Sequence, residues 1–263
     1  MSFSGRVASE TRAAGKAFLR RRTAVFFTFL FPLLIVGIFG VLIQTRPTGG
    51  GLFTESPAYY VPGYLAVVVL FTPLSRVGSE VARHREGNRF EKLATTPLSR
   101  VEWLAAQTLV NVLIIGAAAV LILVVMVLGT GAEIALSPLL GVFLALGVAL
   151  FCAVGAIIGS LADSQDGVIS ASNGIAIPLL FLSETFVPPY LLPEWFRPVM
   201  DLSPLSYFSR GVRAVVDPPG AGVDGVVVAT WPSGPDPLFN LAVLAVLAAV
   251  AFAVGAIALP RTD

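Results

Sequence analysis

The side chains that most often carry catalysis or bind metals are scarce in this sequence. It has one histidine, His84, one cysteine, Cys152, and two lysines, Lys16 and Lys92. A serine protease needs a histidine beside its nucleophile, and a structural zinc site draws on several cysteines or histidines. A phosphate-binding loop needs the pattern G-x-x-x-x-G-K-[ST], and neither lysine stands in it. We therefore expect that the chain is not an enzyme and binds no metal and no cofactor of its own.

Charged side chains gather instead in residues 80–100, EVARHREGNRFEKLATTPLSR. Asn88 and Glu91 have the spacing of a helix-capping pair, in which each side chain accepts from the backbone N–H of the other. The ring of Pro97 disfavours helical geometry in the residue before it. This pattern predicts a short helix within residues 86–98.

A second capping pair, Ser99 and Glu102, follows at once and precedes a long apolar stretch. Two caps so close together indicate a short, rigid element joined to an apolar helix on each side. Phe90 and Leu93 fall on one face of the short helix, because residues three or four apart lie above one another.

The composition shows what the rest of the chain must be. The sequence is 56% hydrophobic and only 13% charged, whereas a soluble domain has roughly 25% charged residues. Six stretches lack charged side chains, and a helix that crosses the hydrocarbon core takes about 20 such residues. We predict an all-α polytopic membrane protein, with the shortest stretch at residues 167–183. The predicted spans are residues 24–44, 57–76, 102–130, 135–162, 166–184 and 237–259.

The distribution of positive charge predicts the orientation of these spans. Alternate connecting segments, which are residues 1–23, 76–102, 163–166 and 260–263, carry 13 of the 17 lysines and arginines. Lys and Arg mark the cytoplasmic side of a membrane protein. We therefore expect a multi-pass protein of the plasma membrane with both termini and the short helix in the cytoplasm. The net charge of +1 gives no indication of nucleic-acid binding, and none is expected.

Residues 1–23 precede the first span and have their own pattern. On a helical wheel Phe3, Val7 and Phe18 share one arc, and cations such as Arg12 and Lys16 share the opposite arc. This predicts an interfacial helix that lies in the membrane plane with its cations toward anionic headgroups. The alternative is a disordered basic leader that only sets the topology.

Two segments resemble a known family. Residues 86–102, EGNRFEKLATTPLSRVE, are similar to the pattern E-x-G-T-x-E-x-L-x-x-T-P-L-S-R-x-E between spans two and three of ABC-2 type transporter permeases. The second likeness, to the family's outer-face signature, is carried by Pro178, Phe181, Leu182, Ser183, Pro188, Leu192, Pro193, Trp195, Leu202, Pro204, Leu205, Tyr207 and Arg213. Within the family the chain is most similar to drug and lipid exporter permeases of the daunorubicin-resistance type.

The resemblance implies a partner protein and an assembly. In similar permeases the helix between spans two and three sits in a cleft of a separate ATPase subunit, which binds ATP and Mg²⁺ and is present in two copies. A second permease protomer, identical or paralogous, completes a pathway for an amphiphilic or hydrophobic substrate. The residues expected to couple to the ATPase are Arg85, Glu86, Arg89, Phe90, Glu91, Leu93, Thr96 and Pro97. The alternative for this segment is a solvated basic loop whose charges only reflect topology.

The segment after the fifth span is expected to lie at the outer face. Its five prolines exclude one long helix and predict a re-entrant hairpin of short helices over residues 186–213. Glu184 precedes it and is expected either to favour a cationic substrate or to pair with Arg210 or Arg213 as a gate. The alternative is a hydrated interfacial carboxylate. The residues expected at the outer gate or along the substrate path are Glu184, Phe186, Pro188, Trp195 and Tyr207.

A competing function is a secondary carrier or a membrane scaffold that works without an ATPase. Carriers driven by protons or sodium usually place ionisable side chains in the middle of the membrane. The six apolar stretches contain none, which favours the permease.

Overall fold

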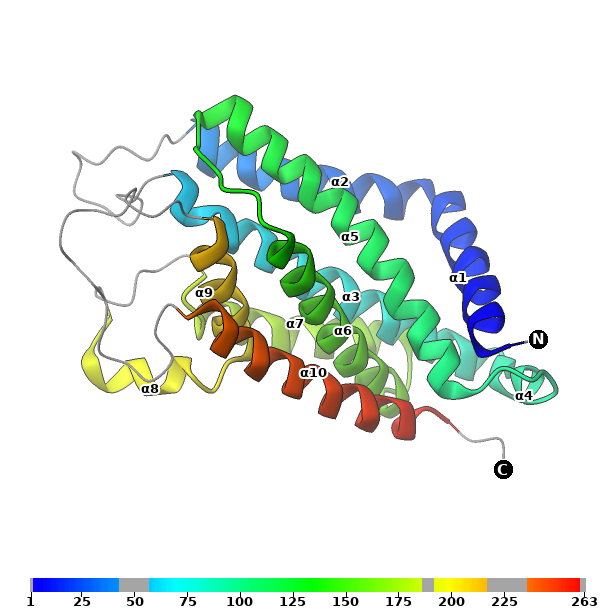
Figure 1. The fold of residues 1–263 in the computed structure, drawn as a ribbon. Helices are drawn as coiled ribbons and strands as arrows, with labels where there is room; N and C mark the ends of the chain where they lie inside the picture. Colours follow the sequence, from blue (N-terminus) through cyan, green and yellow to red (C-terminus); the bar gives the residue numbers. More distant parts are fainter. Residues whose placement is uncertain (1, 43–56, 186–191, 217–235, 261–263) are drawn as a thin grey trace.

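The computed structural model of the protein describes residues 2–42, 57–185, 192–216 and 236–260, and these are helical with no strand among them (Figure 1). The principal helices are α1 (Phe3–Arg20), α2 (Arg22–Ile35), α3 (Val61–Glu86), α4 (Arg89–Ala94), α5 (Arg100–Thr130), α6 (Pro138–Leu161), α7 (Gln165–Phe181), α8 (Arg197–Met200), α9 (Pro204–Val216) and α10 (Pro237–Ala258). A π-helical segment η1 (Val36–Leu42) continues α2, and short 3₁₀ segments η2 (Pro57–Tyr60) and η4 (Glu194–Phe196) precede α3 and α8.

The prediction of an all-α polytopic membrane protein is confirmed. Among the described residues, five helical stretches are long and apolar enough to cross a bilayer: Arg22–Gly40, Pro57–Glu86, Arg100–Thr130, Pro138–Leu161 and Pro237–Ala258. Two other long helices fall outside this set: α1, the predicted interfacial helix, has 18 residues, and α7 has 17 residues, which is short for a span of about 20 residues. The count of six spans therefore stays a prediction.

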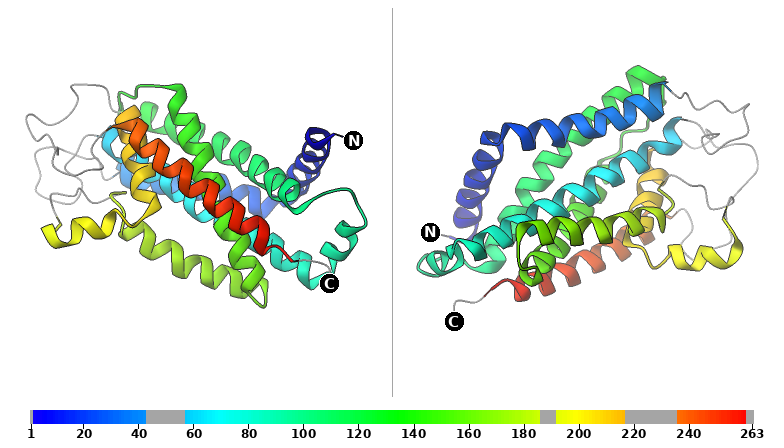
Figure 2. Two further views of the ribbon diagram at one scale, coloured as in Figure 1. Left: turned by 60° about the horizontal axis from the view of Figure 1, so that its bottom comes forward. Right: turned by 180° about the vertical axis from the view of Figure 1, so that it is seen from behind.

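The long helices form one bundle in which successive helices alternate in direction. Helices α2, α5 and α7 run away from α4, whereas α3, α6 and α10 run toward it (Figures 1 and 2). The start of α1 and the end of α10 lie at the same end of the bundle as α4, which we call the α4 end. Helix α8 lies at the opposite end, the α8 end.

Helix α3 forms the centre of the bundle and packs against α5, α6, α7 and α9. Its crossing with α6 depends on small residues at the point of contact. A Cβ atom on Gly159 would overlap the carbonyl oxygen of Gly78, and one on Gly155 would lie 2.5 Å from the carbonyl oxygen of Leu74. The G-x-x-x-G spacing of Gly155 and Gly159 thus lets two helix backbones touch.

The ends of two helices differ from the predicted boundaries. Helix α3 continues for ten residues past the predicted span end at residue 76 and stops only at Glu86. Helix α1 crosses the α4 end at a steep angle to α2 (Figure 1) and packs on α5. Its predicted apolar arc becomes more buried along the helix, from Phe3 at 56% exposed to Phe18 at 4%. This face therefore contacts protein in addition to any lipid.

Candidate functional site

The short helix α4 stands at the tip of the α4 end, between α3 and α5. The backbone N–H of Gly87 donates to the carbonyl of Arg83, and that of Asn88 donates to the carbonyl of Arg85, both at 3.1 Å. Asn88 has a φ of 49°, the left-handed conformation that commonly follows the last turn of a helix. An N-cap residue has extended geometry, so the prediction that Asn88 caps the short helix is wrong: Asn88 ends α3, and the predicted helix 86–98 is confined to Arg89–Ala94.

An aromatic cluster fixes α4 to its two neighbours. Phe90 of α4 lies with its ring centroid 5.4 Å from that of His84 on α3 and 5.7 Å from that of Trp103 on α5, and the rings of His84 and Trp103 are 5.5 Å apart. Phe90 stays a predicted coupling residue, and its ring is half-buried against its own chain. Trp103, which the sequence analysis did not single out, is the residue that holds it.

Two further residues expected to contact a partner instead join α3 to the turn between α6 and α7. The Arg85 side chain donates to the carbonyl oxygens of Ser160 at 3.0 Å and Ala162 at 2.8 Å, which occupies acceptors at the end of α6. The Glu86 carboxylate accepts from the backbone N–H of Gln165 at 3.2 Å and from its side-chain amide at 3.1 Å. The end of α3 is therefore joined to the end of α6 and the start of α7.

The predicted capping pair at the start of α5 is confirmed and is extended by α1. The Glu102 N–H donates to Ser99 Oγ at 3.2 Å, and the Ser99 N–H donates to Glu102 Oε2 at 2.7 Å. Arg6 of α1 donates from Nε to Glu102 Oε1 at 2.9 Å. Glu102 is 1% exposed, so water has little access to the carboxylate of the Arg6–Glu102 ion pair. One carboxylate thus connects the start of α5 to α1.

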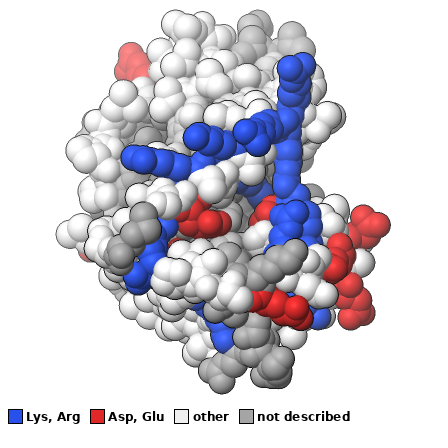
Figure 3. All heavy atoms as spheres, turned by 90° about the vertical axis from the view of Figure 1, so that its right-hand side faces the viewer, with Lys and Arg blue, Asp and Glu red and all other residues white. Residues whose placement is uncertain are grey.

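The exposed part of this site is charged. Arg89, Glu91, Thr96 and Pro97 are exposed, and the Leu93 side chain lies outside what the structure describes. Lys and Arg side chains extend over much of the α4 end, with smaller acidic areas between them (Figure 3). The expected coupling residues therefore divide into an anchored group, which is Arg85, Glu86 and Phe90, and an exposed group at the tip.

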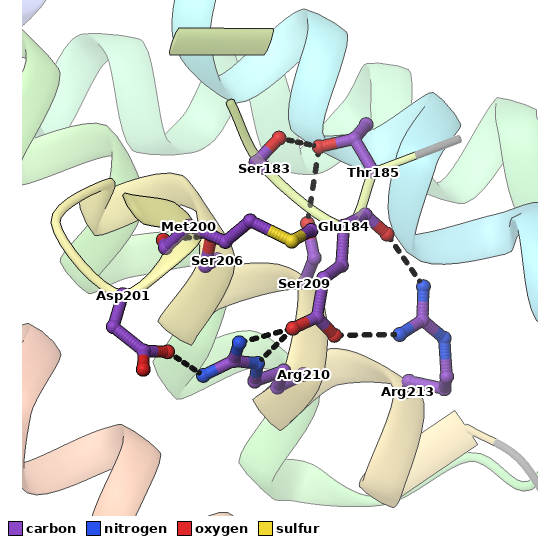
Figure 4. Close-up of polar contacts among 9 residues, drawn as sticks. All are labelled: Ser183, Glu184, Thr185, Met200, Asp201, Ser206, Ser209, Arg210 and Arg213. Carbon is purple, nitrogen blue, oxygen red and sulfur yellow. Dashed lines mark hydrogen bonds and ion pairs between the residues drawn. The ribbon is translucent and has the colours of Figure 1, made fainter. Parts of the chain in front are cut away.

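The second candidate site lies at the α8 end, around Glu184 in the turn after α7. Glu184 is 6% exposed, which rules out a hydrated interfacial carboxylate. Arg210 of α9 donates from Nε to Glu184 Oε1 at 2.6 Å and from Nη1 to Asp201 at 2.6 Å. Arg213 donates to the backbone carbonyl of Glu184 at 2.8 Å (Figure 4). The structure therefore brings Glu184 together with both arginines that the sequence analysis named.

Hydroxyl groups surround this ion-pair cluster and tie α7 to α9. Ser183 and Thr185 share a hydrogen bond, and Thr185 Oγ1 lies 3.4 Å from Ser209 Oγ (Figure 4). All three residues are buried. The Arg213 guanidinium also stacks 4.1 Å above the ring of Tyr59 in η2, so the cluster reaches the start of α3. Ser183 was named only as part of the outer-face likeness, and Thr185 and Ser209 were not predicted because isolated serines and threonines carry no periodic signal.

Of the other expected residues of the outer site, the structure describes Trp195 and Tyr207, and Tyr207 interacts electrostatically with Asp201 and Arg210 of the Glu184 cluster. Trp195 is 73% exposed in η4. Tyr207 is half-buried on α9. Phe186 and Pro188 lie outside the described residues, so the predicted hairpin 186–213 is seen only from residue 192 onward, as η4, α8 and α9.

Long apolar helices in an alternating bundle, with a charged tip at one end, define a polytopic membrane protein. The particular family follows from sequence comparison. The family model described as ABC-2 type transporter matches residues 10–216, which is most of the chain, and the protein belongs to this family. It is therefore a membrane subunit of a transporter.

Two relatives agree with this assignment. The chain is 27% identical over 195 residues to the daunorubicin resistance ABC transporter permease protein DrrB1 of Streptomyces coeruleorubidus, and the match covers 71% of this chain and 66% of the relative. It is 26% identical over 211 residues to the putative transport permease ycf38 of Porphyra purpurea, over 74% of this chain and 68% of that protein. The matched region thus spans about two thirds of each relative.

Proposed function

We propose that this protein is the permease subunit of an ATP-binding cassette exporter, and that a separate subunit in two copies binds ATP and Mg²⁺ and supplies the energy. The α4 end faces the cytoplasm of a plasma-membrane protein, because the segments at that end carry most of the lysines and arginines. The substrate is an amphiphilic or hydrophobic compound, a drug or a lipid. The family and the printed name of the first relative support this proposal.

The observation that carries the proposal is the way α4 is anchored. Its tip presents exposed Arg89 and Glu91, which can form charge-complementary contacts with an ATPase. Its base is fastened to α3 and α5 through the ring of Phe90. A push on the tip is therefore delivered to two long helices, whereas a solvated loop without these contacts would absorb it.

The path for the substrate is completed by a second protomer. Helix α7 exposes Ser170, Asn173 and Gly174 on one side although most of the helix is apolar. Polar side chains at membrane depth are stabilised by hydrogen bonds across helices and not by lipid. We place this side of α7 against the other permease copy and the substrate path between the two copies. The Glu184 cluster then closes the path at its outer end.

The coupling proposal is tested by co-expressing this protein with a candidate Walker-motif ATPase from the same genome. Charge reversal at the exposed tip, Arg89→Glu with Glu91→Arg, should abolish co-purification of the ATPase and ATP-dependent efflux of a fluorescent amphiphile from vesicles, while membrane insertion stays normal. Arg12→Glu is the matched control, because Arg12 is an exposed cation of the same end on α1. Full efflux without the ATPase would favour the carrier or scaffold and contradict the permease.

The dimer is tested by cross-linking. Cys152 is buried and is the only cysteine, so Cys152→Ala provides a cysteine-free background. Gly174→Cys should form a disulfide-linked dimer in membranes. Leu113→Cys on α5, which is also exposed, should not. A cross-link at position 113 and none at position 174 would place the second copy against α5 and contradict its placement against α7.

A further inference from the structure

A cavity of about 590 Å³ lies between α1, α2 and α3 near the α4 end of the bundle. It opens beside α4, because Arg89 of the exposed tip is one of its lining residues, and it is separate from the Glu184 cluster. Three arginines from three different parts of the chain line it: Arg21 between α1 and α2, Arg76 on α3, and Arg89 on α4. Neither the coupling role nor the outer gate explains why these cations converge on an internal space.

The positive charge around the cavity is only partly neutralised. The Glu80 carboxylate contacts Arg83, lies 3.5 Å from Arg21 and lies 3.4 Å from Nε2 of His84. One carboxylate is therefore shared by three basic side chains. Arg83 also interacts electrostatically with Arg21, Arg76 and Arg89, so the four guanidinium groups form one cluster.

Arg76 and Arg89 have no ion pair with a carboxylate among the described residues, and Arg76 is the less exposed of the two. It donates from Nη1 to the side-chain oxygen of Asn111 at 3.2 Å, and its Cζ lies 4.6 Å above the ring of Phe18. Both partners are uncharged, and no carboxylate pairs with Arg76 in the part of the chain that the structure describes. A guanidinium shielded from water gains most from an anion that it can bind through two N–H groups, such as a phosphate or a carboxylate.

One further carboxylate faces the cavity, that of Glu10 on α1. Burial raises the pKa of Glu10, although the nearby His84 acts in the opposite direction. The Glu10 carboxyl is thus less able than an exposed glutamate to neutralise the arginine cluster. Substitution of Glu10 therefore distinguishes the two kinds of ligand, because an anionic ligand does not need this carboxylate and a cationic ligand does.

Phe27 and Phe71 of the lining lie farther from the α4 end than the arginines do, together with Thr28 and Thr72. Ser75 and Ser79 add hydroxyl groups near the arginines. Phe27 follows Arg21 along α2, which runs away from the α4 end, and Phe71 precedes Arg76 along α3, which runs toward it. The aromatic part therefore lies deeper in the bundle than the cationic part. This is the arrangement of an amphiphile with its headgroup at the membrane surface and its chain toward the hydrocarbon.

We propose that this cavity binds an anionic phospholipid of the cytoplasmic leaflet, with its phosphate among Arg21, Arg76 and Arg89 and its acyl chain along Phe27 and Phe71. The leaflet rests on the orientation proposed above, whereas the ligand chemistry rests on the cavity alone. The depth agrees, because Arg76 ends the predicted span 57–76, where lipid phosphates lie.

The test is lipid retention by the purified full-length protein. Native mass spectrometry would compare dioleoylphosphatidylglycerol with dioleoylphosphatidylcholine at equal concentrations, with and without millimolar inorganic phosphate. We expect one phosphatidylglycerol to be retained about tenfold more strongly than phosphatidylcholine, because a hydrogen-bonded charge pair discriminates by about that factor or more. Equal retention of the two lipids would overturn the proposal. Displacement by inorganic phosphate would show that the site takes the free ion and would overturn the amphiphile.

Variants assign the binding to the cavity. Arg76→Gln should weaken phosphatidylglycerol retention about tenfold, and Arg89→Gln, which changes an exposed side chain, provides a second reading if Arg76→Gln does not fold. Arg12→Gln, which lies outside the cavity, should have no effect. Glu10→Gln should leave retention unchanged or increase it. If Glu10→Gln weakened lipid retention and the arginine variants did not, the ligand would be cationic and the proposal would be refuted.

The experiment uses no ATPase and measures no transport. If the Arg89→Glu, Glu91→Arg protein lost coupling to the ATPase, lipid retention by Arg76→Gln would still test the cavity by itself. Normal ATP-dependent efflux with no lipid selectivity would remove the cavity proposal and leave the permease.

Discussion

Substitution of Glu184 by glutamine tests whether the outer cluster is a buried structural element. Glutamine keeps the size of the side chain but removes its negative charge, so the Arg210 guanidinium loses its ion pair with Glu184 and retains that with Asp201. Breaking a buried ion pair by removing one partner costs about 3 to 5 kcal/mol. The backbone carbonyl that accepts from Arg213 is retained. We therefore expect the lower end of that range, about 3 kcal/mol.

The chain provides its own reporter for this measurement. Cys152 is the only cysteine and is fully buried, so a thiol-reactive fluorophore labels it only as the bundle opens. A loss of about 3 kcal/mol corresponds to a Tm lower by roughly 6 to 12 °C in a chain of this size. A double-mutant cycle with Arg210→Gln isolates the pair, and the double variant should be less destabilised than the sum of the two single variants.

Glu194→Gln is the matched control. Glu194 is an exposed acid in η4 of the same outer region, and such a change usually alters stability by less than about 0.5 kcal/mol. Two results would refute this reasoning: labelling curves of Glu184→Gln and Glu194→Gln that coincide, or destabilisation by Glu184→Gln and Arg210→Gln that is additive. Either result would show that the Glu184 carboxylate does not stabilise the fold through a buried ion pair.

Three further predictions concern the rest of the bundle. Gly159→Leu should block the α3–α6 crossing, because its Cβ overlaps the backbone at Gly78, and should reduce the yield of folded protein in size-exclusion profiles. Gly116→Leu is the control and should be tolerated, because nothing lies within 4 Å of an added Cβ at that position. Phe90→Ala should destabilise the anchoring of α4 by about 2 kcal/mol and be detected as faster tryptic cleavage at α4, with normal bundle stability by Cys152 labelling; unchanged cleavage would argue against the aromatic anchor. Arg6→Gln should release α1 and accelerate proteolysis within it while Glu102 still caps α5, and equal proteolysis of both proteins would mean that the ion pair does not hold α1.

The six apolar stretches could be read from the sequence because the requirement behind them is local. Each segment that crosses a bilayer must satisfy its own backbone hydrogen bonds, so length and composition are enough to find it. The Ser99–Glu102 capping pair was also predictable, since it joins residues three apart. For the same reason the charged segment 80–100 could be recognised as distinct from the spans.

Local patterns failed where two local structures compete. An asparagine after a helix and before another can end the first or cap the second, and the sequence alone does not choose between them. The outcome at Asn88 depends on α3 continuing to Glu86, which its contacts with α6 and α7 support. The helix propensity of a short charged stretch is too weak to decide this.

The sequence by itself determined the class of the protein, the position of its apolar helices, the charged segment between two of them, and the pairing candidates for Glu184. Only the tertiary structure decided what each charged or aromatic side chain contacts. Phe90 meets Trp103, Arg85 meets the end of α6, and Arg76 meets the side-chain amide of Asn111, because helices distant in the chain pack side by side. Burial of a segment requires only an apolar composition, and this can be seen in the sequence. A hydrogen bond or ion pair requires two groups within about 3 Å, and only the packing of the helices brings such groups together.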